Sequence, residues 1–276
     1  MKLQRKPSFT LLSPAKINYF FLIIGKRSDS FHEIASLFQA INLFDKLTFE
    51  LAEFDQFTCN IKSLEDSSNS VIKALKLFRK EFQINDKVKI HLEKKIPVQA
   101  GLGGGSSNAA TTLWALNKLF REKKDESKLI KLAARLGSDV PFFFSNGSAI
   151  CKGRGEIVEN VNIPSIQGWI LQPNFGMCTK SVYANIQSIQ QKHEYRTLLK
   201  EFQRGNFCFV NDLFIHAAEV QPKIKDVKIQ HPSAQMTGSG SCFFSLERPN
   251  TTSLVKKIYP FNGILRKPLS WYSINL

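Results

Sequence analysis

The sequence predicts an α+β protein of one large or two medium-sized domains. Its 276 residues exceed the ~100–200 residues of a typical folding unit. Hydrophobic residues make up 43% of the chain and charged residues 22%, so a sizeable core is available and a disordered or fibrous chain is excluded. Segments with the periodicity of strands also alternate with segments that have the periodicity of helices.

Three segments of the first half have the character of strands. Residues 17–24 are rich in β-favouring side chains, and residues 45–51 alternate apolar and polar positions. Residues 87–93 alternate strictly, with Val88 and Ile90 on one face. These three segments are expected to form a sheet.

The second half contains a new set of strand signals. A short apolar strand is expected at 169–171, and a glycine-rich turn within 236–246 leads into another apolar strand. We therefore place a domain boundary near Pro164, which gives domains over residues 1–163 and 164–276.

Helical periodicity appears in three places. Asn69 or Ser70 is a suitable N-cap for a helix whose apolar residues continue to Phe82. Residues 108–120 and 126–136 also place apolar side chains on one helical face. The second of these helices ends at Gly137, so Asp139 should lie just past a helix end.

The net charge is strongly positive, with 38 Lys and Arg against 23 Asp and Glu, or +15. A basic protein attracts polyanions, so both nucleic acid and a small phosphorylated ligand are possible partners. Acidic residues are interspersed among the lysines, and no block of basic residues stands out. We expect most of this charge to lie on solvated helix faces and favour the small ligand.

The sequence favours a cytoplasmic protein. Its longest apolar run, 17–24, contains Asn18 and is far shorter than the ~18 residues of a membrane helix, and no export signal is recognisable. The five cysteines are scattered, with no CxxC pair and no histidine at ligand spacing. A reduced compartment is expected, and neither a membrane partner nor a metal–cysteine site.

The strongest local motif is Gly101-Leu-Gly-Gly-Gly-Ser-Ser107, between a strand and a helix. Glycines let backbone N–H groups converge on phosphate oxygens, and the N-terminus of the next helix adds positive potential. A tight structural turn is the alternative, but four glycines within five positions cost backbone entropy without structural return. The loop is not a Walker A motif, because no Lys-Ser/Thr follows the last glycine.

Two charged residues are candidates for chemistry. Lys16 precedes an apolar strand, although a lysine at a strand edge usually points to water. Asp139 is a lone carboxylate beside the apolar stretch 140–144, and a helix or turn cap is an equally good interpretation of it.

Together these motifs resemble the GHMP kinases. The segments that carry the resemblance occur in the family's order: Pro14-Ala-Lys-Ile-Asn18, Gly25-Lys-Arg-Ser-Asp-Ser-Phe-His32, Pro97 to Ala110, Gly137-Ser-Asp-Val-Pro141 and Met236-Thr-Gly-Ser-Gly-Ser-Cys242. The first two segments favour the branch that phosphorylates 4-diphosphocytidyl-2-C-methyl-D-erythritol (CDP-methylerythritol). The resemblance covers nearly the whole chain.

The resemblance implies a fold and a set of site residues. The fold would be a two-domain GHMP kinase fold, with an N-terminal domain like ribosomal protein S5 domain 2 and a ferredoxin-like C-terminal domain. Lys16 and Asp139 match the catalytic pair, and Asn69 matches an adenine contact. Asn18, Phe31, His32, Thr179 and Tyr183 match positions that hold the cytidine-containing substrate. The ATP phosphate segment is matched by Pro97, Val98, Gln99, Ala100, Gly101, Leu102, Gly103, Gly104, Gly105, Ser106 and Ser107.

The chain departs from the family pattern in its loops. Ser30 replaces a glycine before the aromatic-His pair, and Phe31 stands where tyrosine is common. Gln99 and Ala100 replace glycines that often open the phosphate loop. These changes put the shape of the loops in doubt, but they remove no catalytic group.

The implied activity is transfer of the γ-phosphoryl group of ATP to a tertiary hydroxyl of CDP-methylerythritol. Mg²⁺ bridging the ATP phosphates is expected on chemical grounds, although no paired carboxylates indicate a dedicated metal site. A monomer or a weak homodimer is expected. Two alternatives remain: a GHMP kinase of the homoserine or mevalonate type, and a basic nucleic-acid-binding protein, although the interleaved basic and aromatic residues of an RRM are missing.

Overall fold

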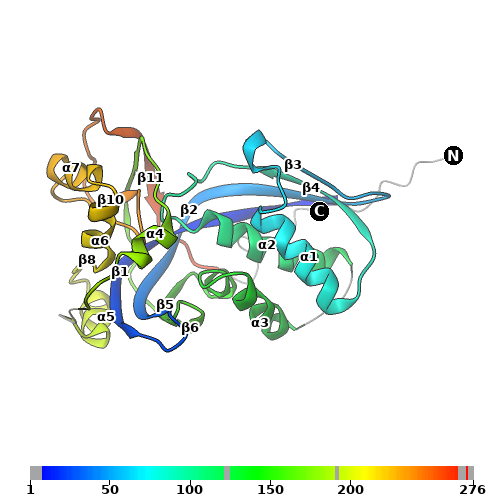
Figure 1. Ribbon diagram of the computed structural model, residues 1–276, viewed down its shortest axis with the longest axis horizontal. Helices are drawn as coiled ribbons and strands as arrows, with labels where there is room; N and C mark the ends of the chain where they lie inside the picture. Colours follow the sequence, from blue (N-terminus) through cyan, green and yellow to red (C-terminus); the bar gives the residue numbers. More distant parts are fainter. Residues whose placement is uncertain (1–7, 121–124, 190–192, 267–271, 273–276) are drawn as a thin grey trace.

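Two long antiparallel strands run through the whole molecule. The computed structural model describes residues 8–120, 125–189, 193–266 and 272. Strands β1 (Ser8–Lys26) and β2 (His32–Ala52) pair along almost their entire length and extend across both ends of the molecule (Figure 1). They are longer than the predicted strands at 17–24 and 45–51, because buried polar residues such as Lys16 and Gln39 interrupt the apolar pattern but are hydrogen-bonded inside the fold.

The first sheet is built around this pair and has seven strands. Its main order is β3-β4-β2-β1-β8, while β5 pairs with the other end of β2 and β6 pairs with β5. The predicted strand at 87–93 is confirmed as β4. The remaining strands are β3 (Gln56–Cys59), β4 (Lys87–Glu93), β5 (Ser148–Gly153), β6 (Ile157–Asn160) and β8 (Val210–Asn211).

Three helices pack beside this sheet: α1 (Ser70–Phe82), α2 (Gly104–Leu119) and α3 (Glu126–Leu136). All three were predicted, and Asn69 caps α1 by accepting a hydrogen bond from the N–H of Val71. The start of α2 was predicted at Asn108, which is wrong, because the helix begins at Gly104. Gly103 in a left-handed conformation ends the loop, and its carbonyl accepts the first helical hydrogen bond, from Ser107.

The second sheet has four antiparallel strands in the order β11-β7-β10-β9. The strands are β7 (Gln167–Pro173), β9 (Gln235–Met236), β10 (Phe243–Ser245) and β11 (Val255–Asn262). The predicted strand at 169–171 and the strand after the glycine-rich turn are both confirmed. In chain order this arrangement is fourth-first-third-second, as in a ferredoxin-like fold. The second helix of that fold is missing, since residues 246–254 connect β10 to β11 without one.

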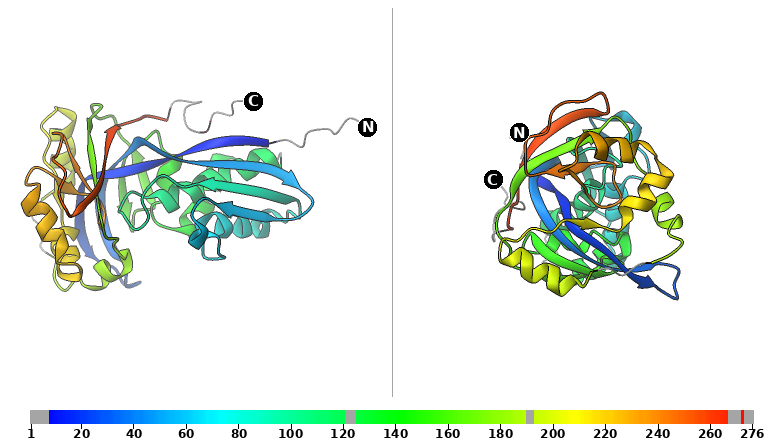
Figure 2. Two further views of the ribbon diagram at one scale, coloured as in Figure 1. Left: turned by 90° about the horizontal axis from the view of Figure 1, so that it is seen from above. Right: turned by 90° about the vertical axis from the view of Figure 1, so that its left-hand side faces the viewer.

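Four further helices lie at the end of the molecule away from α1 (Figures 1 and 2): α4 (Thr179–Ala184), α5 (Tyr195–Gln203), α6 (Leu213–Val220) and α7 (Lys223–Gln230). Helices α4, α6 and α7 cover the second sheet around Leu171 and Phe243. A separate apolar cluster that includes Phe20 and Phe261 joins the two sheets. A domain boundary near Pro164 stays a prediction.

Short 3₁₀ turns complete the fold. One covers Lys62–Leu64 before α1, and the other covers Pro141–Phe144 directly after Asp139. All five cysteines are free thiols. Among the residues that the structure describes, no helix is both long and apolar enough to cross a membrane.

Candidate active site

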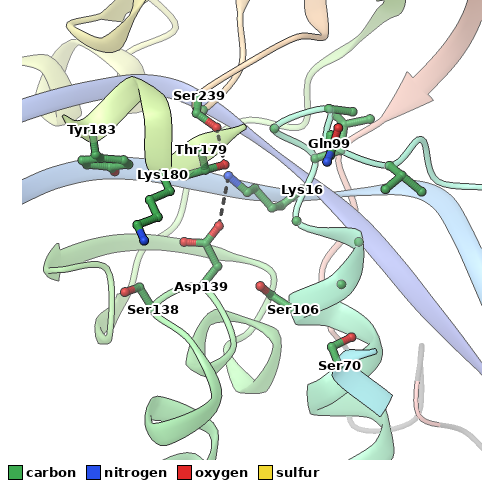
Figure 3. A pocket seen from close by; sticks show the side chains of 18 of the residues that line it. Lys16, Ser70, Gln99, Ser106, Ser138, Asp139, Thr179, Lys180, Tyr183 and Ser239 are labelled. Carbon is green, nitrogen blue, oxygen red and sulfur yellow. Dashed lines mark hydrogen bonds and ion pairs between the residues drawn. The ribbon is translucent and has the colours of Figure 1, made fainter. Parts of the chain in front are cut away.

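A cavity of about 1010 Å³ is bordered by the Lys16 segment of β1, the loop before α2 and helix α4, and both halves of the chain line it. Helices α2 and α4 border it from opposite sides, and the Lys16 segment of β1 crosses between them (Figure 3). Its volume is at the upper end of the range for small-molecule sites, ~300–1,000 Å³. The cavity therefore has room for two ligands that meet within it.

Lys16 and Asp139 meet in this cavity. The Lys16 ammonium lies 3.4 Å from Asp139 Oδ2, and the lysine side chain is 3% exposed whereas that of Asp139 is 32% exposed. Lys16 also lies 4.4 Å from the centre of the Phe38 ring, so its charge is held in a mostly apolar wall. Lys16 lies inside β1 and not just before it, which overturns the interpretation as a water-facing edge lysine.

Asn18 is tied to this pair but does not line the cavity. Its Oδ1 accepts a hydrogen bond of 2.6 Å from Lys16, and its Nδ2 donates to Ser36 Oγ at 2.9 Å. Its backbone N–H donates to Thr237 Oγ1 at 3.0 Å. Asn18 is 2% exposed and lies behind the lysine, and its contact with the substrate stays a prediction.

The glycine loop leads into the N-terminus of α2, which faces the cavity. Residues 97–106 line the cavity, whereas Ser107 is fully buried and accepts a hydrogen bond from Ser13. The first N–H groups of a helix have no partner within the helix, and Ser106 in the first turn of α2 lies beside the space in front of Asp139 (Figure 3). This is the arrangement that binds phosphate oxygens at helix N-termini.

The glycines of this loop differ in what a side chain at each position would contact. Gly103 has φ +67°, and a Cβ there would lie 2.8 Å from Lys16 Cγ, so this glycine makes room for the lysine. At Gly101 a Cβ would meet the Thr237 carbonyl at 2.2 Å. At Gly105 a Cβ would make only an ordinary van der Waals contact, with Ser70 Oγ at 3.7 Å. The expectation that these glycines bring no structural return is therefore wrong for Gly101 and Gly103.

Asn69 lines the same cavity on the far side of the loop. Both polar groups of its side chain are engaged, because Oδ1 caps α1 and Nδ2 donates to the Leu64 carbonyl at 2.9 Å. Its contact with adenine stays a prediction.

The other end of the cavity is aromatic. His32 and Tyr183 lie with ring centroids 5.8 Å apart, and Phe31 is 49% exposed at the rim, which overturns the alternative that it is a core residue. Burial lowers the pKa of His32, and nearby Lys26 and His216 lower it further, so its ring is neutral near pH 7. Burial raises the pKa of the Tyr183 hydroxyl, and the charge of Asp139 adds to this effect.

Thr179 begins α4 at the cavity wall. Its hydroxyl lies 2.7 Å from Ser239 Oγ, in the glycine-rich turn that follows β9. This contact joins α4 to the segment that also holds Thr237, the partner of Asn18. The predicted substrate residues Phe31, His32, Thr179 and Tyr183 therefore share one cavity with Lys16 and Asp139, and Asn18 does not.

Two of the three residues that replace family glycines have the left-handed backbone conformation that favours glycine. Ser30 has φ +67° and Gln99 has φ +53°, whereas Ala100 does not have a positive φ. A side chain in this region costs roughly 1–2 kcal/mol. The two loops thus retain left-handed backbone at positions where the chain has lost glycine.

Sequence reasoning missed several lining residues. The Arg154 guanidinium carbon lies 4.8 Å from the centre of the Phe31 ring, and Ser138, Lys180 and Ser239 lie around the Lys16–Asp139 pair (Figure 3). Arg154 lies in the Gly153-Arg-Gly155 turn and Ser239 in the Thr-Gly-Ser-Gly turn, both of which were visible in the sequence. No sequence signal marks Lys180.

Comparison with known proteins gives the family. Residues 69–147 match the GHMP kinases N terminal domain. A 4-diphosphocytidyl-2-C-methyl-D-erythritol kinase of Protochlamydia amoebophila is 41% identical over 96% of this chain and 93% of that protein. One from Chlamydia muridarum is 35% identical over 94% and 96%. This chain belongs to the 4-diphosphocytidyl-2-C-methyl-D-erythritol kinase family.

Solved structures agree with this family. A crystal structure of 4-(cytidine 5'-diphospho)-2C-methyl-D-erythritol kinase superposes with a TM-score of 0.77 at 28% identity, covering 92% of this chain and 99% of the other. Homoserine kinase from Cytophaga hutchinsonii superposes with a TM-score of 0.65 at 16% identity, covering 88% and 85%, and this likeness shows the fold alone. The predicted GHMP kinase fold is confirmed.

A kinase of this family uses ATP as its phosphate donor, whereas Mg²⁺ beside the ATP phosphates stays a prediction. No group of three or more His, Cys, Asp or Glu side chains suited to a metal ion occurs within the described ranges. Mg²⁺ usually needs only one or two protein oxygens besides substrate phosphates. Ser106 and Asp139 present oxygen atoms toward the same space (Figure 3), so these two residues would hold the ion, which would neutralise phosphate charge.

Proposed function

We propose that this chain transfers the γ-phosphoryl group of ATP to the 2-hydroxyl of CDP-methylerythritol. The products are the 2-phosphate and ADP, in the non-mevalonate route to isoprenoid precursors. One observation carries the proposal: a single cavity joins the N-terminus of α2, the Lys16–Asp139 pair and an aromatic end with His32, whose pKa is lowered by burial. The names of the relatives support the same reaction.

Asp139 is the proposed base. The attacking hydroxyl must lose a proton, and the Asp139 carboxylate is the acidic group that faces both Lys16 and the N-terminus of α2. Lys16 attracts negative charge that develops on the hydroxyl oxygen, and Asn18 fixes the position of its ammonium. The rest of catalysis is positioning, which is what phosphoryl transfer chiefly requires.

The two ligands enter from opposite ends. ATP places its phosphates against Gly105 and Ser106 and its adenine toward Asn69, because these residues lie together on the α1 and α2 side. The cytosine lies between Phe31 and Tyr183, where His32 reads its polar edge. The acceptor hydroxyl then reaches Asp139 at the middle of the cavity.

The aromatic end argues against the alternatives. Homoserine and mevalonate have no ring that would stack on Phe31 or Tyr183. Nucleic acid is disfavoured because, among the described residues, Phe31 and Phe54 are the only exposed aromatic side chains, and the others are buried or partly buried.

The test is ADP formation by the purified protein with each acceptor in turn. CDP-methylerythritol should support turnover, and homoserine and mevalonate should not. Turnover with either of the latter, or an equal ATPase rate without acceptor, would overturn the proposal.

A further inference from the structure

Lys180 lines the cavity, and the proposed mechanism assigns no function to it. It is the second residue of α4, and its side chain is exposed. From α4 it extends toward Ser138 and Asp139 (Figure 3). Its neighbour Thr179 is fixed by the contact with Ser239, so the base of the Lys180 side chain has a defined position.

Lys180 differs from the other cations that line the cavity. Each of the others faces a carboxylate: Lys16 faces Asp139 at 3.4 Å, Lys94 faces Asp45 at 2.6 Å, and Arg154 faces Glu156 at 3.6 Å. Lys180 forms no ion pair with any residue in the described ranges. Its charge is therefore available to an anionic ligand, whereas the others are already offset by protein.

The place of Lys180 indicates which anion it meets. It lies between Tyr183, at the cytosine end, and Asp139, at the reaction centre (Figure 3). In CDP-methylerythritol a pyrophosphate joins the cytidine to the methylerythritol. With the cytosine at Tyr183 and the hydroxyl at Asp139, that pyrophosphate must cross the space beside α4.

We propose that Lys180 binds the pyrophosphate of the acceptor substrate and so selects acceptors linked to a nucleoside diphosphate. This inference rests on the proposed function, because it assumes the orientation of CDP-methylerythritol given above. The γ-phosphoryl of ATP is the less suitable partner, since the N-terminus of α2 already faces it with the N–H groups of its first turn. Lys180 acts on affinity for the acceptor and takes no part in proton transfer.

The test compares binding of CDP and of cytidine by calorimetry. Lys180→Gln removes the charge but keeps most of the side chain. It should weaken CDP binding about tenfold, the loss expected for a hydrogen bond to a charged group, and leave cytidine binding unchanged. Lys180→Arg should restore most of the CDP affinity. The matched control is Lys223→Gln on α7, an exposed lysine outside the cavity, which should change neither.

Steady-state kinetics distinguish a failure of the Lys180 role from a failure of the proposed kinase function. Lys180→Gln should raise KM for CDP-methylerythritol about tenfold, with kcat and KM for ATP within about twofold of the parent. Equal loss of CDP and cytidine affinity, unchanged CDP affinity, or a fall confined to kcat would each overturn the role of Lys180. If the unaltered enzyme neither binds CDP nor phosphorylates CDP-methylerythritol, the proposed function itself fails.

Discussion

The two ends of the acceptor site are built differently. Around Lys16, buried side chains form a continuous network in which Asn18 links the lysine to Ser36 and to Thr237, from opposite halves of the chain. Around Phe31 the side chain is half exposed, and the turn before it contains Ser30 with φ +67°. The proposed reaction centre is thus held by the core, whereas Phe31 at the proposed cytidine end lies on a surface hairpin.

Because the two regions are built differently, substitutions in them should change different measured quantities. Changes in the buried network disturb the orientation of a catalytic group and the hydrogen bonds of the interior together. Changes on the hairpin remove ligand contacts but little packing. We therefore expect kcat and stability to follow the first region, and KM for CDP-methylerythritol to follow the second.

The largest expected effect is at Asp139. Asp139→Asn should lower kcat by about two orders of magnitude or more, because the amide cannot accept the hydroxyl proton, while ATP binding is retained. Steady-state kinetics and ATP calorimetry measure the two effects. Asp125→Asn, at the exposed start of α3, is the matched control and should keep full activity. Near-normal kcat in folded Asp139→Asn would remove the carboxylate from the mechanism.

An intermediate effect is expected at Gly105. A Cβ there would contact only Ser70 Oγ, at 3.7 Å, and a valine side chain would occupy the space that the ATP phosphates need, so ATP affinity should fall at least about tenfold with no loss of thermal stability. Gly25→Val is the control, because nothing lies within 4 Å of its Cβ position. Unchanged ATP affinity by calorimetry would make the loop a structural turn. Gly103→Val is less informative, since it would also displace Lys16.

The smallest effect is expected at Ser30. Ser30→Gly relieves a left-handed conformation but adds freedom to the unfolded chain, so the free energy of unfolding should rise by about 0.5–1 kcal/mol. Chemical denaturation measures this difference, and KM for CDP-methylerythritol should not change. A raised KM would show that the serine shapes the cytidine site, and lower stability would show that the turn is not strained.

Much of the fold was predictable because its signals are local. Alternation at 87–93 and helical spacing at 126–136 gave β4 and α3 with their observed bounds. The lengths of β1 and β2 were not predictable, because buried polar residues such as Lys16 have partners far away in the sequence. A ferredoxin-like fold would have a helix after β10, and no pattern in the sequence indicated that residues 246–254 would lack it.

The site shows the same limit. The glycine loop, Asp139 and the Phe31–His32 pair belong to short motifs, so their residues could be chosen from sequence, although their functional roles stay proposals. Asn18 was grouped with substrate residues because it stands in the motif of Lys16, and only the fold shows that it is buried behind the lysine. Lys180 belongs to no motif and is singled out because no carboxylate among the described residues forms an ion pair with it. Oligomeric state and cytoplasmic location stay predictions.

The most direct test of the difference between the Lys16 network and the Phe31 hairpin uses two variants, Asn18→Ala and Phe31→Ala. For each variant, kcat, KM for CDP-methylerythritol and the melting temperature are measured. The account predicts that Asn18→Ala lowers kcat about tenfold or more and lowers the melting temperature, with KM nearly unchanged. It predicts that Phe31→Ala raises KM about tenfold and leaves kcat and the melting temperature nearly unchanged. A raised KM with normal kcat in Asn18→Ala, or a destabilised Phe31→Ala with normal KM, would contradict the division between the two regions.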